Sequence, residues 1–367
     1  MKRAVQLTHI RQLCCLGITG RALMPALLRA LREFVDADSA GFFWVDAKGD
    51  MTNLYADRML PPELMKLYFE RHYDGPEVPF RAQFKKRAAA NDPVSAPIAT
   101  ADLLKTAYYN EILRNLDAYH VMYAVIRDQG DALGQLSLYR TRKAPGFSAD
   151  DRAAIRDVTR YVAHAVSRPE KVSTDTQYVD TDDEGLVIVD ANGTIRHGSP
   201  SSLNLLSMVA NRRFNQQSPP LAVGDAAPES VPRLIQRVFQ IARGDMMSTP
   251  GATAPREDVD GPWGRFLLSA YPLDEHAGQS MMENALYGVH IRRKQHLVLK
   301  LAEAMGALEL SSQQREVALL LAQGKTNQEI SVALNVTNNT ASYHVKQLFL
   351  RLDAHDRAEA VSKLMRA

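Results

Sequence analysis

The sequence of 367 residues has little cysteine, no long apolar run and almost no net charge. Its two cysteines, Cys14 and Cys15, are adjacent and cannot form a metal site by themselves, so buried or inert thiols are favoured over a redox pair. No run of about 18 apolar residues and no charged-then-apolar leader is present. We therefore expect a cytoplasmic protein that does not enter a membrane.

Patterns that signal catalysis are missing as well. The sequence has no Gly-rich phosphate loop, no metal-ligand spacing and no nucleophile elbow. The three adjacent carboxylates at residues 182–184 favour a solvated surface over a catalytic site. No receiver domain precedes the C-terminal helices, which argues against control by aspartyl phosphorylation. The sequence thus predicts a protein that is not an enzyme and that holds no metal and no cofactor.

The small net charge is unevenly distributed. From Arg292 onward the chain has eleven Lys/Arg against seven Asp/Glu, a surplus of four positive charges, so the rest of the chain carries a net charge of −2. A modest positive surplus suits a nucleic-acid-binding module that needs dimerisation for affinity. The length suits two or three domains.

Residues 337–352 show the clearest helical periodicity. Along one face, four apolar residues repeat at helical spacing: Ala341, Val345, Leu348 and Leu352. The opposite face has four hydrogen-bonding residues, one of them cationic: Asn339, Ser342, Tyr343 and Lys346. Such a helix suits the major groove of DNA, although an ordinary solvated helix has the same pattern.

The segments around this helix predict three more helices. Ser311 with Gln314, and Thr326 with Glu329, have the spacing of capping boxes that begin two helices. Residues 335–337 form a tight turn before the long helix, and a last helix begins near residue 356. Four short helices, two of them joined by a three-residue turn, predict a helix-turn-helix unit.

The whole of residues 308–367 resembles the LuxR/FixJ/GerE-type DNA-binding domain. The matching residues are 316–317, 320–324, 326–327, 329–330, 340, 344–345, 352 and 357–360. Two positions depart from the family pattern. Gln313-Gln314 stands where Arg-Glu is usual, and Asp353 stands where glycine usually follows the long helix. Neither departure lies on the polar face of the helix.

We expect this unit to bind double-stranded DNA. Three side chains should reach base edges: Lys346, Tyr343 and Ser342. Five should contact phosphates or set the docking angle: Thr326, Asn339, Thr340, His344 and Arg351. The closing helix, residues 357–365, should pair with its twin in a homodimer, so that the operator has two half-sites related by a two-fold axis.

Residues 1–168 read as an α+β domain that resembles a GAF domain. The pattern predicts a helix at 21–35, a hairpin at 40–55, helices at 61–73 and 101–115, a second hairpin at 119–140 and a closing helix to 166. The irregular stretch 75–97 separates the two middle helices. Residues 147–151 cap the closing helix, and residues 147–152 are the most GAF-like piece.

This first domain is rich in aromatic residues, as a pocket for an apolar or aromatic effector would be. The candidate ligand-binding residues are Phe42, Trp44, Tyr68, Tyr108, Tyr119 and Tyr123. An ordinary domain core would use the same residues. Residues 67–76 also resemble part of the acyl-homoserine-lactone pocket of LuxR quorum-sensing proteins, without the tryptophan one turn upstream.

Residues 182–293 form a second α+β domain, after a polar linker at 168–181. A strand at 185–190, an Asn-Gly turn, a return strand at 194–197 and a helix at 201–209 resemble the opening of a PAS domain. Closing strands are expected at 264–273 and 285–292. The Pro- and Gly-rich pieces 218–232 and 248–261 are expected to be loops.

A connector helix, residues 294–307, should join the second domain to the helix-turn-helix unit. Its Leu297, Leu301 and Met305 lie on one face and could pair across a dimer or pack within one chain. The predicted fold class is therefore a multidomain α+β protein: a GAF-like and a PAS-like sensor domain, followed by an all-α four-helix DNA-binding domain.

These patterns predict an effector-responsive transcriptional regulator of the LuxR type that binds a two-fold operator as a homodimer. Its partners would be double-stranded DNA, a small apolar or aromatic effector and a second copy of the chain, with RNA polymerase as a candidate partner. The alternative is a regulator that acts mainly by protein–protein contact, in which the sensor-like domains serve for dimerisation.

Overall fold

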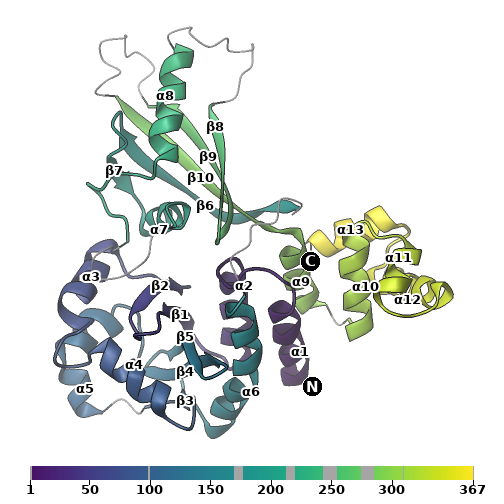
Figure 1. Ribbon diagram of the computed structural model, residues 1–367, viewed down its shortest axis with the longest axis horizontal. Helices are drawn as coiled ribbons and strands as arrows, with labels where there is room; N and C mark the ends of the chain where they lie inside the picture. Colours follow the sequence, from purple (N-terminus) through teal and green to yellow (C-terminus); the bar gives the residue numbers. More distant parts are fainter. Residues whose placement is uncertain are drawn as a thin grey trace.

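The computed structural model describes residues 2–97, 100–168, 177–211, 220–242, 254–273, 285–308 and 310–366. Figure 1 shows two α+β blocks, each built on its own sheet, and a helical unit that the C-terminal segment forms beside them. Among these described residues, no helix has both the length and the apolar character to cross a membrane.

Each block contains a five-stranded antiparallel sheet. The first sheet has the order β2-β1-β5-β4-β3 and the second β7-β6-β10-β9-β8, so within each block the order is 2-1-5-4-3. The first sheet consists of β1 (Ser39–Val45), β2 (Met51–Ala56), β3 (Val94–Ser95), β4 (His120–Asp128) and β5 (Asp131–Arg140). The second consists of β6 (Tyr178–Asp190), β7 (Ile195–Gly198), β8 (Arg256–Gly261), β9 (Gly264–Pro272) and β10 (Leu286–His296).

Helices cover both faces of the first sheet. One face packs on α2 (Gly20–Phe34) and α6 (Ala149–Val166), and α1 (Lys2–Cys14) packs on these two helices. The other face is covered by the insertion α3 (Pro62–Leu67), η1 (Tyr68–His72), α4 (Phe80–Ala89), α5 (Ala101–Lys105) and η2 (Tyr109–Leu113), where η marks a π-helical turn. Because side chains alternate along a strand, Phe42 faces the three long helices and Phe43 faces the insertion.

The remaining helices belong to the second block and the C-terminal unit. The second block has α7 (Pro200–Val209) and α8 (Ser230–Ala242). The C-terminal part consists of α9 (Leu297–Ala307), α10 (Ser312–Ala322), α11 (Asn327–Ala333), α12 (Asn338–Leu352) and α13 (Arg357–Arg366). The predicted α+β blocks followed by an all-helical unit are thus confirmed.

Several local predictions were wrong. The stretch 75–97 contains α4 and β3, which were expected to be irregular. Residues 248–261 were expected to be a loop, yet β8 occupies its end. In α4 only Phe80 and Phe84 are buried, among many Lys and Arg, so its apolar stripe is too narrow to recognise. In β8, charged residues fall on both faces of an edge strand, which hides the alternation.

Boundaries also moved, and one helix was not expected. The predicted linker ends earlier than expected, because β6 begins at Tyr178, and the predicted connector helix begins later, because β10 continues to His296. Tyr178 and His296 are partners at the end of the β6/β10 pairing. The predicted loop 218–232 ends where α8 begins at Ser230. No helix was predicted over α1, which has almost no amphipathic pattern of its own and packs against α2, α6 and α9.

A tryptophan from the second block joins the two blocks. Trp263, at the turn between β8 and β9, is buried and packs edge-on against Trp44 of β1, with 5.6 Å between ring centroids. The ring of Tyr55 in β2 also packs against Trp263, with 5.8 Å between ring centroids. The first block therefore uses Trp44 for contact with its neighbour.

A buried arginine braces the same junction. Arg293 is 3% exposed, and its guanidinium donates to the Trp263 carbonyl at 2.9 Å and to the Ala22 carbonyl of α2 at 3.2 Å. It also pairs with Asp183 at 3.0 Å. Three segments from two blocks thus meet at one side chain, four residues before α9 begins.

We expect Arg293→Met to lower the free energy of unfolding. Removing one partner of a buried ion pair costs about 3–5 kcal/mol, and since Asp183 is partly exposed we expect about 2–3 kcal/mol here. Urea denaturation of the full chain measures this. The half-exposed neighbour Arg292 provides the control, with Arg292→Met changing stability by less than about 0.5 kcal/mol. Equal losses for both variants would contradict the bracing role.

Candidate nucleic-acid interface and sensor cavity

The long helix α12 packs through its apolar face. Ala341, Val345, Leu348 and Leu352 are buried, as the periodicity predicted. Thr337 caps the helix by accepting from the Thr340 amide. At the other end Asp353 has a φ of 52°, so it adopts the left-handed conformation for which glycine is more usual. The departure from the family pattern therefore leaves the helix stop unchanged.

Capping boxes begin the two preceding helices, as predicted. Ser311 and Gln314 exchange side-chain and backbone hydrogen bonds at the start of α10. Thr326 and Glu329 do the same at α11. Gln314 thus takes the glutamate's place in the capping box, which accounts for one departure from the family pattern.

The opposite face of α12 carries the residues predicted to contact DNA. Asn339, Lys346 and Arg351 are exposed, and Tyr343 is 59% exposed. His344 is half-buried, with its ring 5.7 Å from that of Tyr343. Thr340 bonds to the capping Thr337, and Thr326 is exposed at the start of α11. The exposed members form a polar surface on one side of the unit.

Ser342 differs from its neighbours because it holds the unit together. Its hydroxyl accepts a hydrogen bond from Asn327 at 3.1 Å, and Asn327 accepts one from Arg357 at 3.0 Å. Arg357 also donates to the Lys325 carbonyl. This chain ties α11, α12 and α13 together, and it gives Ser342 a positioning contact in addition to its predicted base contact.

The connector α9 joins this unit to the first block. It packs on α1 and α2 on one side and on α10 and α13 on the other. Leu301 and Met305 are fully buried in this packing, so they pack within one chain. In Figure 1, α12 lies on the side of the unit away from both blocks, whereas α9, α10 and α13 lie between. The blocks thus leave the polar face of α12 open.

Residues from three helices meet at this junction. The ring of His9 in α1 lies so close to α9 that a Cβ at Gly306 would be 2.9 Å from it. Arg315 of α10 is 2% exposed and donates to the Leu310 and Leu308 carbonyls, at 3.1 and 3.3 Å. Burial, and secondly the charge of Arg315, lower the pKa of His9 from 6.5 to about 4. His9 is therefore neutral at physiological pH.

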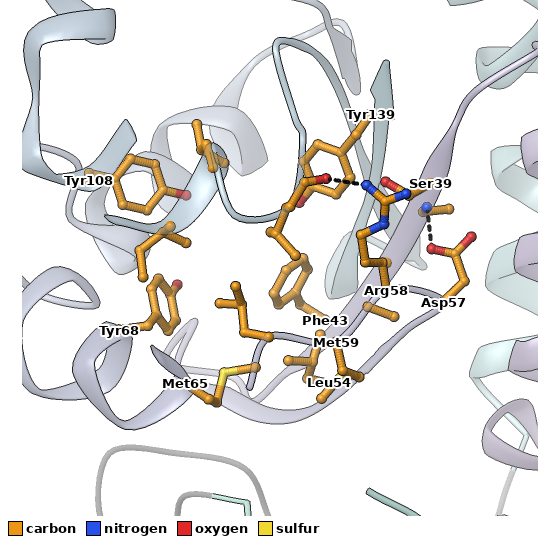
Figure 2. A pocket seen from close by; sticks show the side chains of 17 residues that line it. Ser39, Phe43, Leu54, Asp57, Arg58, Met59, Met65, Tyr68, Tyr108 and Tyr139 are labelled. Atoms are coloured by element: carbon orange, nitrogen blue, oxygen red, sulfur yellow. Dashed lines mark hydrogen bonds between the residues drawn. The ribbon is translucent and has the colours of Figure 1, made fainter. Parts of the chain in front are cut away.

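A cavity lies in the first block, between the sheet and the helical insertion. Figure 2 shows Tyr68 and Tyr108 from the insertion facing Phe43 and Tyr139 from the sheet across it. Its volume is about 60 Å³, and its wall is mostly apolar, including Leu54, Leu60, Met65, Ile112, Leu113 and Leu116. At its rim Arg58 donates to the Leu116 carbonyl at 3.1 Å and Asp57 accepts from the Ala40 amide at 2.9 Å.

Residues 308–364 match the luxR family of bacterial regulatory proteins, over the four helices just described. The C-terminal unit is a LuxR-family helix-turn-helix domain. Residues 21–166 match the GAF domain, which makes the first block a GAF domain. Both resemblances drawn from the sequence are thereby confirmed, and the PAS-like character of the second block stays a prediction.

Known proteins resemble parts of this chain. The HTH-type transcriptional regulator YhjB of Escherichia coli K12 is 40% identical over 55 residues, 15% of this chain and 28% of that protein. The response regulator protein VraR of Staphylococcus aureus is 38% identical over 52 residues, 14% of this chain and 25% of that protein. The chain thus spans about a quarter of the length of these curated relatives.

Among solved structures, the GAF domain/HD domain protein of Geobacter sulfurreducens aligns with a TM-score of 0.32 and 22% identity. The alignment covers 41% of this chain and 93% of that one.

The GAF-domain cavity and a chamber beside it gather three of the six predicted ligand-binding residues. Tyr68 and Tyr108 line it, and Tyr123 lines an adjoining chamber. Phe42 is on the opposite face of the sheet, and Trp44 contacts Trp263 of the second block. Tyr119 packs on His120 and under Arg142, outside the lining of either chamber. Aromatic content pointed to the block that contains this cavity, but only the strand register shows which side chains face it.

We expect His9 to make the stability of the chain depend on pH. Because its folded pKa is lowered, the unfolded chain takes up a proton first, and stability falls as pH drops from 6.5 towards 4. Because the His9 side chain is partly exposed and screened by solvent, we expect its titration to change the free energy of unfolding by about 1–2 kcal/mol. Urea midpoints at pH 7 and pH 5 (about the middle of that window) measure it.

The variant His9→Phe keeps a flat ring against Gly306 and removes the titrating group. It should lose less stability than the parent between the two pH values. His164→Phe, at an exposed position of α6, serves as the control and should keep the parent's pH dependence. If His9→Phe and the parent respond to pH alike, His9 does not titrate at the junction.

Proposed function

We propose that this protein is a transcriptional regulator that binds a two-fold operator as a homodimer and responds to a small molecule held in the GAF-domain cavity. The observation that carries the proposal is the open polar face of α12. Asn339, Tyr343 and Lys346 are exposed along one line of this helix, while its apolar stripe is buried in the packing with α10, α11 and α13. A donor-rich helix with this exposure suits the major groove.

Lys346 and Tyr343 are the proposed base-reading residues, with Ser342 beside them. Asn339, Thr340, His344, Thr326 and Arg351 are proposed to contact phosphates or to set the docking angle. Thr326 and Thr340 lie at the first turns of α11 and α12, where backbone amides favour an anion.

Packed elements connect the cavity to the LuxR-type domain. Strands β1 and β5 line the cavity on one face, and on the other face the sheet packs against α2 and α6. Those helices contact α1, which meets α9 and α10 at His9, Gly306 and Arg315. A ligand that shifts this packing would move the LuxR-type domain. A useful switch needs about 1–3 kcal/mol of coupling between ligand and DNA.

We expect Lys346→Ala to weaken binding to specific DNA by about 1–3 kcal/mol if the side chain contacts a base. Fluorescence anisotropy with a duplex selected from a random library, and with its scrambled version, measures the loss on each. Lys48→Ala removes the same charge from an exposed turn of the GAF domain and should leave both affinities unchanged. An equal loss on both duplexes would assign Lys346 to phosphate contact.

We expect the full chain to be a dimer at micromolar concentration and to bind a two-half-site duplex as one dimer. Sedimentation velocity of the free protein and of its complex measures both stoichiometries. A monomer that also binds the duplex singly would contradict the homodimer.

One observation supports a second function, regulation through protein contact. Val332 of α11 and Leu350 of α12 are 77% and 74% exposed, which is unusual for apolar side chains in a small helical unit. Leu350 follows Lys346 by four residues and so lies on the same face of α12 as the proposed DNA-contacting residues. A partner such as RNA polymerase could cover Val332 when the unit is on DNA, and Val332→Ser would then reduce transcription without reducing DNA affinity.

A further inference from the structure

We infer that the GAF-domain cavity selects a small cyclic carboxylate, with its ring among the apolar side chains and its anionic head held by Arg87. This inference rests on the proposed effector function and names the class of molecule. It concerns a second chamber beside the one in Figure 2, and a residue that the sequence pattern did not single out.

The two chambers adjoin. The second has a volume of about 40 Å³, and it shares Phe43, Tyr68, Tyr108 and Tyr139 with the first. A water needs about 10–15 Å³ on this scale, so the two chambers together have room for roughly 7–10 non-hydrogen atoms. This is the size of one ring with a small polar substituent.

The chambers differ in polarity. Leu54, Met65 and Ile112 line the first, which suits a ring. Arg87, Gln135 and Ser137 line the second. Gln135 and Ser137 lie in the middle of β5, are 2% and 0% exposed, and hydrogen-bond to each other at 3.2 Å. Buried polar side chains at the centre of a sheet face favour a polar group of the ligand there.

Arg87 reaches this polar chamber from α4. Its guanidinium lies 4.1 Å from the centre of the Tyr123 ring and donates to Gln135 at 2.9 Å. Both of these partners are neutral, and among the described residues no acidic side chain lines the second chamber. A partly buried guanidinium without a counter-charge is costly, and an anionic ligand would supply that charge.

The tyrosine hydroxyls add hydrogen-bond donors. Burial raises the pKa of Tyr68, Tyr108, Tyr123 and Tyr139, and the charge of Arg87 opposes this only in part at the last three. The phenols therefore keep their protons at neutral pH and can donate to a carboxylate. Asp57, at the rim of the first chamber, is already paired with Arg32 at 3.1 Å, so its charge is compensated.

The experiment compares matched probes by isothermal titration calorimetry on the full chain. Benzoate, phenylacetate and cyclohexanecarboxylate are the anionic probes, and their primary amides are the neutral ones of the same shape. In the parent we expect each carboxylate to bind at least about tenfold more tightly than its amide. This ratio needs no variant, so it tests the inference even if substitutions at Arg87 impair folding.

Two variants assign the preference to Arg87. Arg87→Gln should weaken carboxylate binding by about tenfold or more and leave amide binding within about twofold of the parent. Arg87→Lys keeps the charge and should retain part of the preference. Lys86→Gln removes a charge from the exposed adjacent position of α4 and should bind every probe as the parent does.

Each other outcome overturns the inference. Equal binding of carboxylates and amides in the parent would assign the cavity to a neutral ligand, and the absence of any binding would remove this class of ligand altogether. A carboxylate preference that survives in Arg87→Gln would remove Arg87 from the site. Failure of the proposed function is distinguishable, because it would appear as probe binding that leaves the affinity for the selected duplex unchanged.

Discussion

The packing of α9 against α1 on one side and against α10 and α13 on the other is the contact on which the arrangement of the chain depends. Leu301 and Met305 are completely buried there, and one continuous apolar core runs from the helical face of the GAF sheet through α9 into the LuxR-type domain. Burial of such a side chain contributes about 1.5–3 kcal/mol. The DNA-binding domain is therefore packed against the sensor as part of its core. Two buried arginines flank α9: Arg293 before it donates to carbonyls of the second block and of α2, and Arg315 after it donates to the Leu308 and Leu310 carbonyls that lead into α10.

This arrangement limits how a ligand could act. The polar face of α12 is open while the domain is docked, so regulation by covering the reading helix does not fit the structure. A ligand could instead change the position of the docked domain, and in the proposed dimer this would change the spacing of the two DNA-binding domains. The coupling that such a switch needs is about 1–3 kcal/mol, similar to the burial of one apolar side chain. A small repacking at His9 and Gly306, where α1 and α9 nearly touch, is on that scale.

The C-terminal unit was predictable because its signals are local. Each signal involves residues that are close in sequence. These signals are the capping boxes, the four-residue apolar stripe of α12 and the left-handed residue that follows it. The GAF-domain cavity was less predictable because it depends on strand register. Phe42 and Phe43 are adjacent and alike, and only pairing in the sheet decides that Phe43 faces the cavity. The place of Arg87 beside the cavity could not be predicted from sequence for a similar reason. It lies among other basic residues of α4, and its hydrogen-bond partner Gln135 is 48 positions away in sequence.

The position of α13 sets a condition on dimer formation. The sequence predicted that this helix pairs with its twin, and the structure packs it on α9, α10 and α12. Its Ala360 and Leu364 are completely buried in that packing, so pairing through this side would have to displace α9. Exposing Leu301 and Met305 in the process would cost about 3–6 kcal/mol before any new contact forms. Pairing through the side of α13 that carries the exposed Ala358 avoids this cost. A dimer built that way would keep α9 docked, and the sensor would then control the spacing of both reading helices.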